Sequence, residues 1–122
     1  MADTMTKITI ITRREKFEDL RTALLDIGVK GMTVTEVEGC GVQSGIEEIF
    51  RGVKKTVHLI PKIKVEIVVC TVPVDDVIAV AKKVLHTGEI GVGKIFVSEI
   101  QKVVRIRTGD EDKEALRNSD EE

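Results

Sequence analysis

Aromatic side chains are almost absent from this sequence, which has three Phe, no Trp and no Tyr in 122 residues. Proteins that bind single-stranded nucleic acid stack the bases on aromatic rings, and this chain has too few rings for such a platform. Its formal net charge of −2 at neutral pH also provides no basic field that would attract nucleic acid or anionic lipid. These absences argue against an RNA-binding module and against nucleic acid as a partner.

Cysteine, histidine and long apolar runs are also scarce. Cys40 and Cys70 are far apart and His58 and His86 are isolated, so the spacing indicates neither a zinc site nor a disulfide framework. The apolar runs are too short for a membrane-spanning helix, and the first residues lack the basic and apolar regions of a signal peptide. We therefore expect a cytoplasmic protein whose two cysteines are buried, reduced thiols.

Apolar periodicity predicts strands and helices that alternate within a single domain. β-Branched or alternating segments predict strands at residues 7–13, 32–37, 62–69 and 94–100, with a short fifth strand at 103–107. Apolar residues at helical spacing predict one helix from Phe17 to Ile27, before Gly28, and a second between Pro73 and Gly88. This β-α-β-β-α-β order predicts an α+β, ferredoxin-like fold for residues 1–112, followed by an acidic tail at 113–122.

One face of the predicted sheet has no element to cover it. The two helices suffice for one face of four strands, and the sequence offers no third amphipathic helix for the other face. Thr33, Thr35, Lys64 and Glu66 give this open face a mixed rather than a purely apolar character. We therefore expect self-association through the open face, in a closed ring of subunits.

The chain has no G-x-x-x-x-G-K-[ST] phosphate loop, but it has a different glycine turn. Residues 88–94 read Gly-Glu-Ile-Gly-Val-Gly-Lys, and glycine lets the backbone approach a ligand closely. On the predicted fifth strand, Arg105 and Arg107 would point to the same face. Each segment alone is most often a tight turn or a solvated strand face. Together, the glycine turn and the cations Lys94, Arg105 and Arg107 predict a polyphosphate site.

A long loop separates the second and third predicted strands. It runs from Gly39 to about Thr56, where a hairpin connection would need only about 2–5 residues. Loops of this length in compact domains are usually functional or disordered. Ile49, Phe50 and Val53 are apolar residues that a merely solvated loop would not need. We therefore favour a mobile partner-binding arm over an insertion without a role.

Six sequence blocks occur in an order that is specific to one family. They are Gly31-Met32-Thr33-Val34-Thr35-Glu36-Val37, Gly39-x-Gly41-x-Gln43-x-Gly45, Phe50-Arg51-Gly52, Pro61-Lys62-x-Lys64-x-Glu66-Ile67-Val68-Val69, Thr87-Gly88-x-Ile90-Gly91-x-Gly93-Lys94-Ile95-Phe96-Val97 and Arg105-Ile106-Arg107-Thr108-Gly109. Over about residues 6–116, without a gap, the chain resembles the PII family of trimeric nitrogen-regulatory signal-transduction proteins. The resemblance implies a ferredoxin-like fold whose three copies pack their open sheet faces together.

The resemblance also implies ATP or ADP binding in the clefts between neighbouring subunits. The glycine turn and the cations would hold the phosphates, with the two arginines coming from the adjacent subunit, and residues 31–33 would lie at the adenine. Gln43 would also bind Mg²⁺ when 2-oxoglutarate is present. The implied nucleotide-binding residues are Gly31, Met32, Thr33, Gly41, Gln43, Lys62, Gly91, Val92, Gly93, Lys94, Arg105 and Arg107.

The long loop matches the family's T-loop, at about residues 41–56, which changes shape with the ligand and docks on target proteins. The implied partner-binding residues are Phe50, Arg51, Gly52, Lys54 and Lys55. The implied targets are a membrane transporter, such as an ammonium channel, or a metabolic enzyme in nitrogen metabolism. Such a target would recruit the protein to the inner face of the membrane.

The sequence departs from the family pattern at five positions. Lys55 replaces the Tyr that is uridylylated or adenylylated in many members, which excludes that modification, and Val53 replaces a Ser that some members phosphorylate. Val42 replaces an Arg that commonly contacts phosphate, Val92 replaces the Asp of the usual glycine turn, and Ser44 stands where Lys is common. The chain is thus a Tyr-less variant, comparable with the PotN-type branch, and its response to 2-oxoglutarate is left open.

Two alternatives remain at this point. The protein could be an energy sensor without a 2-oxoglutarate response that acts on a transporter other than an ammonium channel. It could instead hydrolyse ATP slowly, because a fold alone does not decide function. Catalysis would need a general base near the glycine turn, and neither histidine has a defensible place there. We therefore expect a regulatory protein rather than an enzyme.

Overall fold

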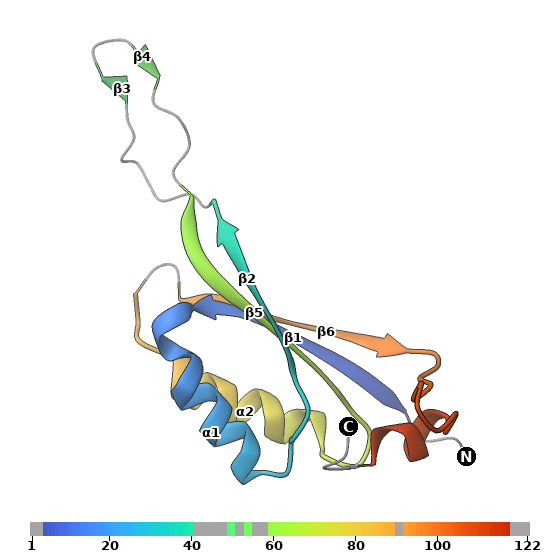
Figure 1. Cartoon of the computed structure of the whole chain (residues 1–122). Coiled ribbons are helices and arrows are strands. Elements are labelled where there is room, and N and C mark those ends of the chain that lie inside the picture. The colour runs from blue at the N-terminus through green and yellow to red at the C-terminus, as the bar shows by residue number, and fades with distance from the viewer. Residues whose placement is uncertain (1–3, 41–48, 51–52, 55–58, 90–91, 118–122) are drawn as a thin grey trace.

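The computed structural model describes residues 4–40, 49–50, 53–54, 59–89 and 92–117. Strands and helices alternate along these residues as expected (Figure 1). Two short 3₁₀ helices, η1 and η2, supplement them. In chain order the elements are β1 (Met5–Arg13), η1 (Arg14–Lys16), α1 (Phe17–Asp26), β2 (Thr33–Gly39), β3 (Ile49–Phe50), β4 (Val53–Lys54), β5 (Ile60–Val69), α2 (Val74–Leu85), β6 (Gly93–Ile100) and η2 (Asp112–Leu116).

Four strands form one antiparallel sheet in the order β2-β5-β1-β6. Strand β1 pairs with β5 on one side and with β6 on the other, and β2 joins the outer edge of β5. Both helices lie on one side of this sheet (Figure 1). The strand order and the βαββαβ sequence of elements are those of a ferredoxin-like fold, which confirms the α+β prediction.

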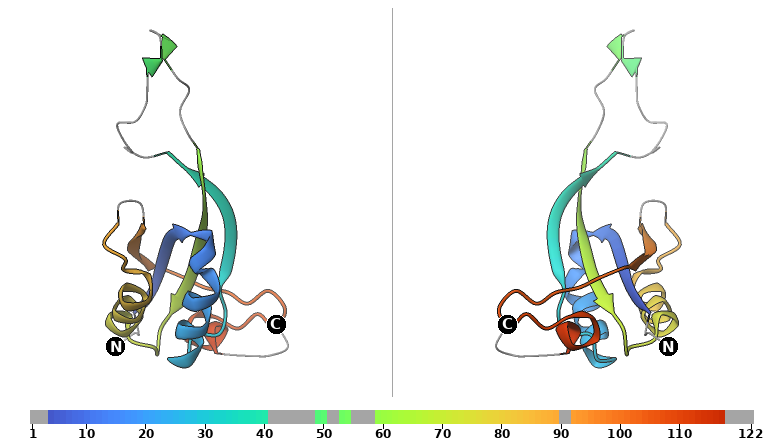
Figure 2. Two further views of the ribbon diagram at one scale, coloured as in Figure 1. Left: turned by 90° about the vertical axis from the view of Figure 1, so that its left-hand side faces the viewer. Right: turned by 90° about the vertical axis from the view of Figure 1, so that its right-hand side faces the viewer.

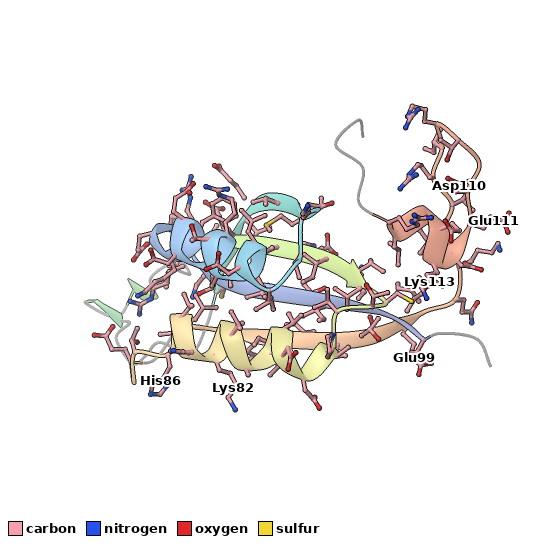
Figure 3. All side chains as sticks on the ribbon, turned by 90° about the horizontal axis from the view of Figure 1, so that it is seen from below. Lys82, His86, Glu99, Asp110, Glu111 and Lys113 are labelled. Atoms are coloured by element: carbon pink, nitrogen blue, oxygen red, sulfur yellow. The ribbon has the colours of Figure 1, made fainter. Side chains whose placement is uncertain are left out.

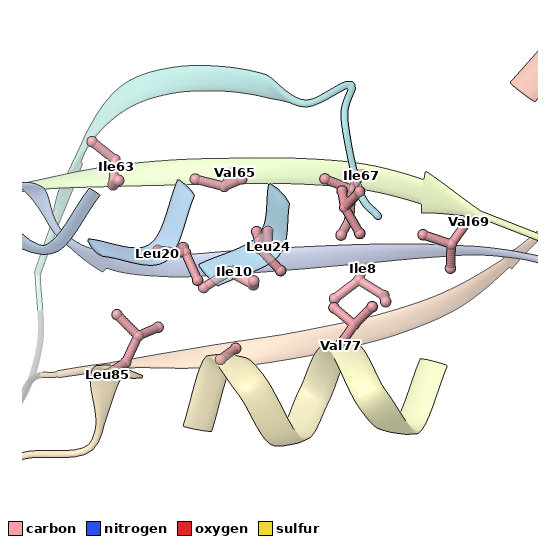
Figure 4. Packing of buried hydrophobic residues seen from close by; sticks show 12 residues of the cluster. Ile8, Ile10, Leu20, Leu24, Ile63, Val65, Ile67, Val69, Val77 and Leu85 are labelled. Carbon is pink, nitrogen blue, oxygen red and sulfur yellow. The ribbon is translucent and has the colours of Figure 1, made fainter. Parts of the chain in front are cut away.

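Alternation along β1 and β5 builds the hydrophobic core. Ile8 and Ile10 of β1 and Val65 of β5 are at most 1% exposed, and they pack with Leu20 of α1 and Val77 of α2, both fully buried (Figure 4). Because successive side chains of a strand point to opposite faces, this apolar set lies on the helix side of the sheet. Truncation of a core residue, as in Leu20→Ala, should cost about 2–5 kcal/mol of unfolding free energy.

The end of α1 directs the chain into the segment that precedes β2. The Gly28 N–H donates to the Leu25 carbonyl (3.0 Å) and the Val29 N–H donates to the Leu24 carbonyl (3.0 Å), which is a Schellman cap. Gly28 has a φ of +99°, the left-handed conformation that this cap requires. The buried side chains of Leu24 and Val29 hold the cap against the core. The cap therefore sets the direction in which the chain leaves α1 and leads into residues 31–33.

Neither α1 nor α2 covers the other face of the sheet (Figure 1). Thr33 and Thr35 of β2 are paired with Glu66 and Lys64 of β5, respectively. Directly paired residues share a face, so these four residues lie together on the open face, as the sequence predicts. Phe96 of β6 is also on this face, opposite Thr9, and is 51% exposed. The open face is therefore mixed in character and carries an exposed aromatic ring.

The segment after β6 differs from the prediction. The fifth strand expected at 103–107 is wrong, because within the described residues only Val104 of this segment pairs, in an isolated bridge with Glu111. The Arg105 N–H donates to the Asp110 carbonyl (2.9 Å), and the Gly109 N–H donates back to the Arg105 carbonyl (2.8 Å). Gly109, with a φ of +80°, turns the chain back on itself before it can extend along the sheet. Figure 2 shows this segment projecting to one side of the sheet.

The connection between β2 and β5 contains two strands that the sequence analysis treated as loop. Strands β3 and β4 pair in antiparallel fashion, with Ile49 opposite Lys54 and Phe50 opposite Val53. They form a separate two-stranded sheet that stands away from the helices and from the four-stranded sheet (Figures 1 and 2). The predicted arm therefore carries a small β-ribbon.

Candidate functional site

Three lysines gather on the open face at one end of the sheet. Lys62 of β5 lies opposite Arg13, Lys64 lies opposite Ile11, and Lys94 of β6 lies opposite the same Ile11 from the other side. Because paired residues share a face and alternate residues along a strand do too, all three lysines lie on the open face. This end of the sheet therefore presents a group of positive charges beside the glycine turn.

The backbone of β1 contacts the last glycine of the turn. Gly93 has a φ of +123°, and a Cβ atom placed on it would lie 1.9 Å from the Ile11 carbonyl oxygen. No side chain fits at that distance, so only glycine allows the turn to approach β1 so closely. Gly88, at the start of the turn, also has a positive φ (+82°), but it has open space around the Cβ position. Of the two glycines of the turn that the structure describes, only Gly93 makes this close approach.

Two neighbouring residues at the end of β1 hold the turn through their side chains. The Thr12 hydroxyl donates a hydrogen bond to the Val92 carbonyl oxygen, with 2.6 Å between the oxygens. The Arg13 guanidinium donates to the Glu89 carboxylate at 3.2 Å. Both the first and the last part of the turn are thus tied to one strand. These contacts would keep the Val92–Gly93 peptide in place for an anion.

A second region lies toward the other end of the sheet. It is a concavity of about 690 Å³ between the start of β2, the end of β5 and the C-terminal segment. Figure 3 shows this arrangement: His86, which follows α2, lies at one end of the molecule, and Asp110, Glu111 and Lys113 lie at the other. Among the residues that line the concavity are Gly31, Met32, Thr33, Lys7, Glu66, Arg105, Ala115, Leu116 and Arg117.

An ion pair lies on the wall of this concavity. The Lys7 ammonium is 3.0 Å from the Glu66 carboxylate, and the two residues occupy diagonal positions on the open face of β1 and β5. The hydrogen bond from Lys7, with the positive charges of Lys7 and Lys64, lowers the pKa of Glu66 below its ordinary value. Glu66 is therefore ionised at neutral pH, and it balances part of the positive charge of this region.

Arg105 is bound by its own chain. One guanidinium nitrogen, Nη1, is 3.3 Å from the Asp110 carboxylate, and the other, Nη2, donates to the carbonyl oxygens of Ala115 (3.2 Å) and Arg117 (2.6 Å). The Arg105 side chain is only 10% exposed, whereas Arg107 is exposed in the turn that follows. The strand from which the two arginines were predicted to point the same way is not formed, because residues 106–108 form a turn.

The structure thus divides the predicted site residues into two groups. Val92, Gly93, Lys94 and Lys62 lie at the glycine-turn end, and Gly31, Met32, Thr33 and Arg105 lie at the concavity. Phe50 and Lys54 lie on β3 and β4. Arg107 belongs to neither group and is exposed in the turn after Arg105. The remaining predicted residues, namely Gly41, Gln43, Arg51, Gly52, Lys55 and Gly91, lie outside the described residues.

Sequence reasoning missed Thr12, Arg13 and Glu89. A signal for Thr12 was present, because it continues the alternation of the buried Ile8 and Ile10 and so places a hydroxyl on the core face. A buried hydroxyl needs a hydrogen-bond partner, which predicts a nearby polar backbone. The pairing of Arg13 with Glu89 had no comparable signal, because the two residues are far apart in sequence.

Three further observations concern membrane-spanning helices, metal sites and the two cysteines. No helix within them is long and apolar enough to cross a membrane. They contain no group of three or more His, Cys, Asp or Glu residues placed to hold a metal ion. Cys40 is an exposed free thiol and Cys70 is half-buried, so the expectation of two buried thiols is wrong for Cys40. Cys40 is exposed because it directly follows β2, where the chain leaves the sheet.

The sequence matches known proteins over nearly its full length. The nitrogen regulatory protein GlnK of Escherichia coli K12 is 46% identical over 112 residues, which are 92% of this chain and all of that protein. The nitrogen regulatory PII-like protein of Bacillus subtilis is 48% identical over 116 residues, which are 95% of this chain and all of that protein.

Solved structures show the same likeness. The B. subtilis GlnK–ATP complex has a TM-score of 0.80 at 45% identity and covers 95% of this chain and 99% of that one. Arabidopsis thaliana PII bound to citrate has a TM-score of 0.74 at 34% identity and covers 93% and 92%, respectively. The model of the family named nitrogen regulatory protein P-II matches residues 5–110. With its ferredoxin-like fold and these matches, the chain belongs to the nitrogen regulatory protein P-II family.

Proposed function

We propose that this member of the family senses adenine nucleotides as a homotrimer, with each nucleotide bound in a cleft between two subunits. The observation that carries this proposal is the separation of the two groups of site residues. Lys94 lies opposite Ile11, whereas the concavity that contains Arg105 reaches β1 at Lys7. Ile11 and Lys7 are four residues apart, or about 14 Å along β1. One phosphate chain is more readily shared by Lys94 of one subunit and Arg105 of the next.

The open face of the sheet supports the assembly. Phe96 is 51% exposed there, and Ile11, Val37 and Val68 on the same face are only half-buried. A second and a third copy of the chain that cover this face would bury these apolar groups and bring the two groups of site residues together. Bound ATP or ADP would then place its phosphates at the glycine turn and its base near residues 31–33. The ATP complex of the related B. subtilis protein supports this ligand class.

Mixed trimers test whether the site lies between subunits. Lys94→Ala and Arg105→Ala each remove one phosphate ligand, so each variant alone should bind ATP about tenfold or more weakly. In trimers assembled from equal amounts of the two variants, about one cleft in four receives Lys94 from one subunit and Arg105 from its neighbour. Isothermal titration calorimetry should detect this fraction of wild-type sites.

The matched control is the double variant Lys94→Ala/Arg105→Ala mixed with itself, which contains no intact cleft of any kind. The decisive comparison is with each single variant measured alone: if the mixture shows no fraction of sites that bind more tightly than these, the site lies within one chain and the proposal fails. Light scattering on the unmutated protein gives a second check, because a monomer would exclude the shared cleft. No heat of binding with ATP or ADP would exclude the nucleotide itself.

We further propose that the segment between β2 and β5 docks on a target protein, either a membrane transporter or a metabolic enzyme of nitrogen metabolism. The support is the β3–β4 ribbon, which stands apart from the sheet, and the sequence Phe50-Arg51-Gly52, which joins β3 to β4 along the chain. Lys54 and Lys55 would add charge-assisted contacts to an acidic partner surface. Pull-down from membranes and from soluble extract, with and without ATP, should retain the wild type but not Arg51→Ala or a loop deletion. Retention of the loop-deleted protein at wild-type level would contradict this role.

The same proposal includes a possible second ligand, 2-oxoglutarate, whose binding is tested separately. Gln43 at the loop root would hold Mg²⁺ together with that ligand, because an amide oxygen is a suitable magnesium donor. Calorimetry with 2-oxoglutarate in the presence of Mg²⁺ and ATP shows whether this protein binds 2-oxoglutarate. If heat appears and Gln43→Ala abolishes it, the protein senses 2-oxoglutarate. No heat identifies a sensor of adenine nucleotides alone.

A further inference from the structure

The hydroxyl of Thr12 is a buried polar group in an otherwise apolar row. Thr12 is 1% exposed and lies on the same face of β1 as Ile8 and Ile10, which belong to the core. A buried hydroxyl without a partner is costly, so its position must be explained by a hydrogen bond. That bond goes to the Val92 carbonyl oxygen at 2.6 Å, which lies in the glycine turn. A core position of β1 is thereby linked directly to the turn.

The geometry of the peptide bond extends this link to Gly93. The carbonyl of Val92 and the N–H of Gly93 belong to one peptide unit, and the described residues contain no cis peptide bond. In a trans peptide the carbonyl and the N–H point in opposite directions. Because Thr12 holds the carbonyl toward the core, the Gly93 N–H is directed away from the Thr12 hydroxyl. An anion would meet this N–H rather than a repulsive carbonyl oxygen.

The backbone of Ile11 restricts the same peptide unit from another side. A Cβ atom on Gly93 would lie 1.9 Å from the Ile11 carbonyl oxygen, so the Cα of Gly93 is packed against β1. The contact sets the distance between the turn and the strand, and the Thr12 hydrogen bond sets how the peptide is rotated. Neither contact needs a bound ligand. The orientation of the Val92–Gly93 peptide is therefore determined before an anion arrives.

We infer that Thr12 is a positioning residue for anion binding, whose hydroxyl fixes the Val92–Gly93 peptide so that its N–H faces the phosphates of a bound nucleotide. The choice of a nucleotide as the ligand rests on the function proposed above. The effect of the hydroxyl on the turn does not, because it is present in the chain without a ligand. Two measurements can therefore separate the positioning from the identity of the ligand.

The binding measurement compares three variants by calorimetry with ATP and with ADP. Thr12→Val keeps the branched shape and removes the hydroxyl, and it should weaken both nucleotides about fivefold to tenfold. Thr12→Ser restores the hydroxyl and should bind within about twofold of the wild type. Thr6→Val is the matched control, because Thr6 is a buried threonine on the same face of β1, opposite Val69 and Glu99. It should leave the affinity unchanged.

The second measurement follows amide hydrogen exchange in the peptide 87–95 without nucleotide. Exchange should be faster in Thr12→Val than in the wild type and Thr12→Ser, and unchanged in Thr6→Val. If Thr12→Val matches Thr6→Val in exchange, or if binding weakens without a change in exchange, the inference is wrong. If exchange responds as expected but no protein binds nucleotide, the positioning stands and the proposed ligand fails. Failure of Thr12→Ser to restore binding would attribute the effect to packing and overturn the inference.

Discussion

The two ends of the sheet hold their functional groups in different ways. At the glycine-turn end, the backbone is fixed by β1: Gly93 packs against Ile11, and Thr12 binds the Val92 carbonyl. At the other end, the functional group is a side chain, Arg105, which is bound by oxygen atoms of the C-terminal segment. One end presents a preset backbone, and the other presents a cation that already has partners.

This difference has a consequence for an anion that needs both ends. The Val92–Gly93 peptide requires no rearrangement, because its orientation is fixed by contacts that contain no ligand. Arg105 must exchange contacts, because the Asp110 carboxylate and the carbonyl oxygens of Ala115 and Arg117 occupy donors that phosphate oxygens would use. A substitution at Gly93 should therefore lower the free energy of unfolding most, and the contacts of Arg105 should set part of the affinity for the anion.

The largest effect is expected at Gly93. Gly93→Ala combines a positive φ with a Cβ atom that overlaps the Ile11 backbone, and it should lower the unfolding free energy by about 3 kcal/mol or more. Gly88→Ala is the matched substitution: it has a positive φ but open space, and it should cost only about 1–2 kcal/mol. Urea denaturation at one fixed subunit concentration measures both values. Equal losses would show that β1 does not constrain the turn.

A smaller effect is expected at Arg105. Asp110→Asn removes the carboxylate beside the guanidinium and keeps the shape, so ATP should bind about twofold to fivefold more tightly. Glu111→Gln is the control, because Glu111 pairs with Lys102 at 2.7 Å instead of with Arg105, and it should not change the affinity. Calorimetry on both variants tests the idea. Weaker binding of Asp110→Asn would mean that Asp110 orients Arg105 for phosphate rather than competing with it.

The fold was largely predictable because its signals are local and periodic. The alternation in β5 places Ile63, Val65, Ile67 and Val69 on the core face, and the structure buries all four. The segment 103–107 was wrongly predicted as a strand, because its alternating apolar and Arg residues satisfy the period of a strand without any pairing partner. Only the hydrogen bonds across Gly109 reveal the turn. Strand patterns at the end of a chain therefore need a neighbouring strand to be reliable.

The site was predictable as a set of residues but not as an arrangement. The cations and glycines could be named because their residue types suit phosphate. Their division between two ends of the sheet depends on the register of β1 with β5 and β6, which the sequence does not specify. The link between Thr12 and Val92 also depends on this register, because it places Thr12 opposite Gly93. Contacts that join strands distant in sequence could not be deduced from composition or spacing.

The smallest expected effect concerns the ion pair between Lys7 and Glu66 beside the concavity. The hydrogen bond from Lys7 lowers the pKa of Glu66 below its ordinary value of 4.5, so the folded state favours the ionised carboxylate. Its stabilising contribution is complete at neutral pH and is lost as the pH falls below 4.5 and through the lower pKa of the folded protein. Both side chains are partly exposed, which keeps the contribution small.

Urea denaturation of the wild type and of Glu66→Gln between pH 7 and pH 3 measures this contribution. The wild type should be slightly more stable at neutral pH, and the difference should shrink on acidification because protonation removes the same charge that the substitution removes. Lys7→Met should show the same trend, since it removes the other partner. A difference that stays constant down to pH 3 would show that Glu66 acts through packing. The concavity would then lack the charge balance that distinguishes it from the lysine-rich end of the sheet.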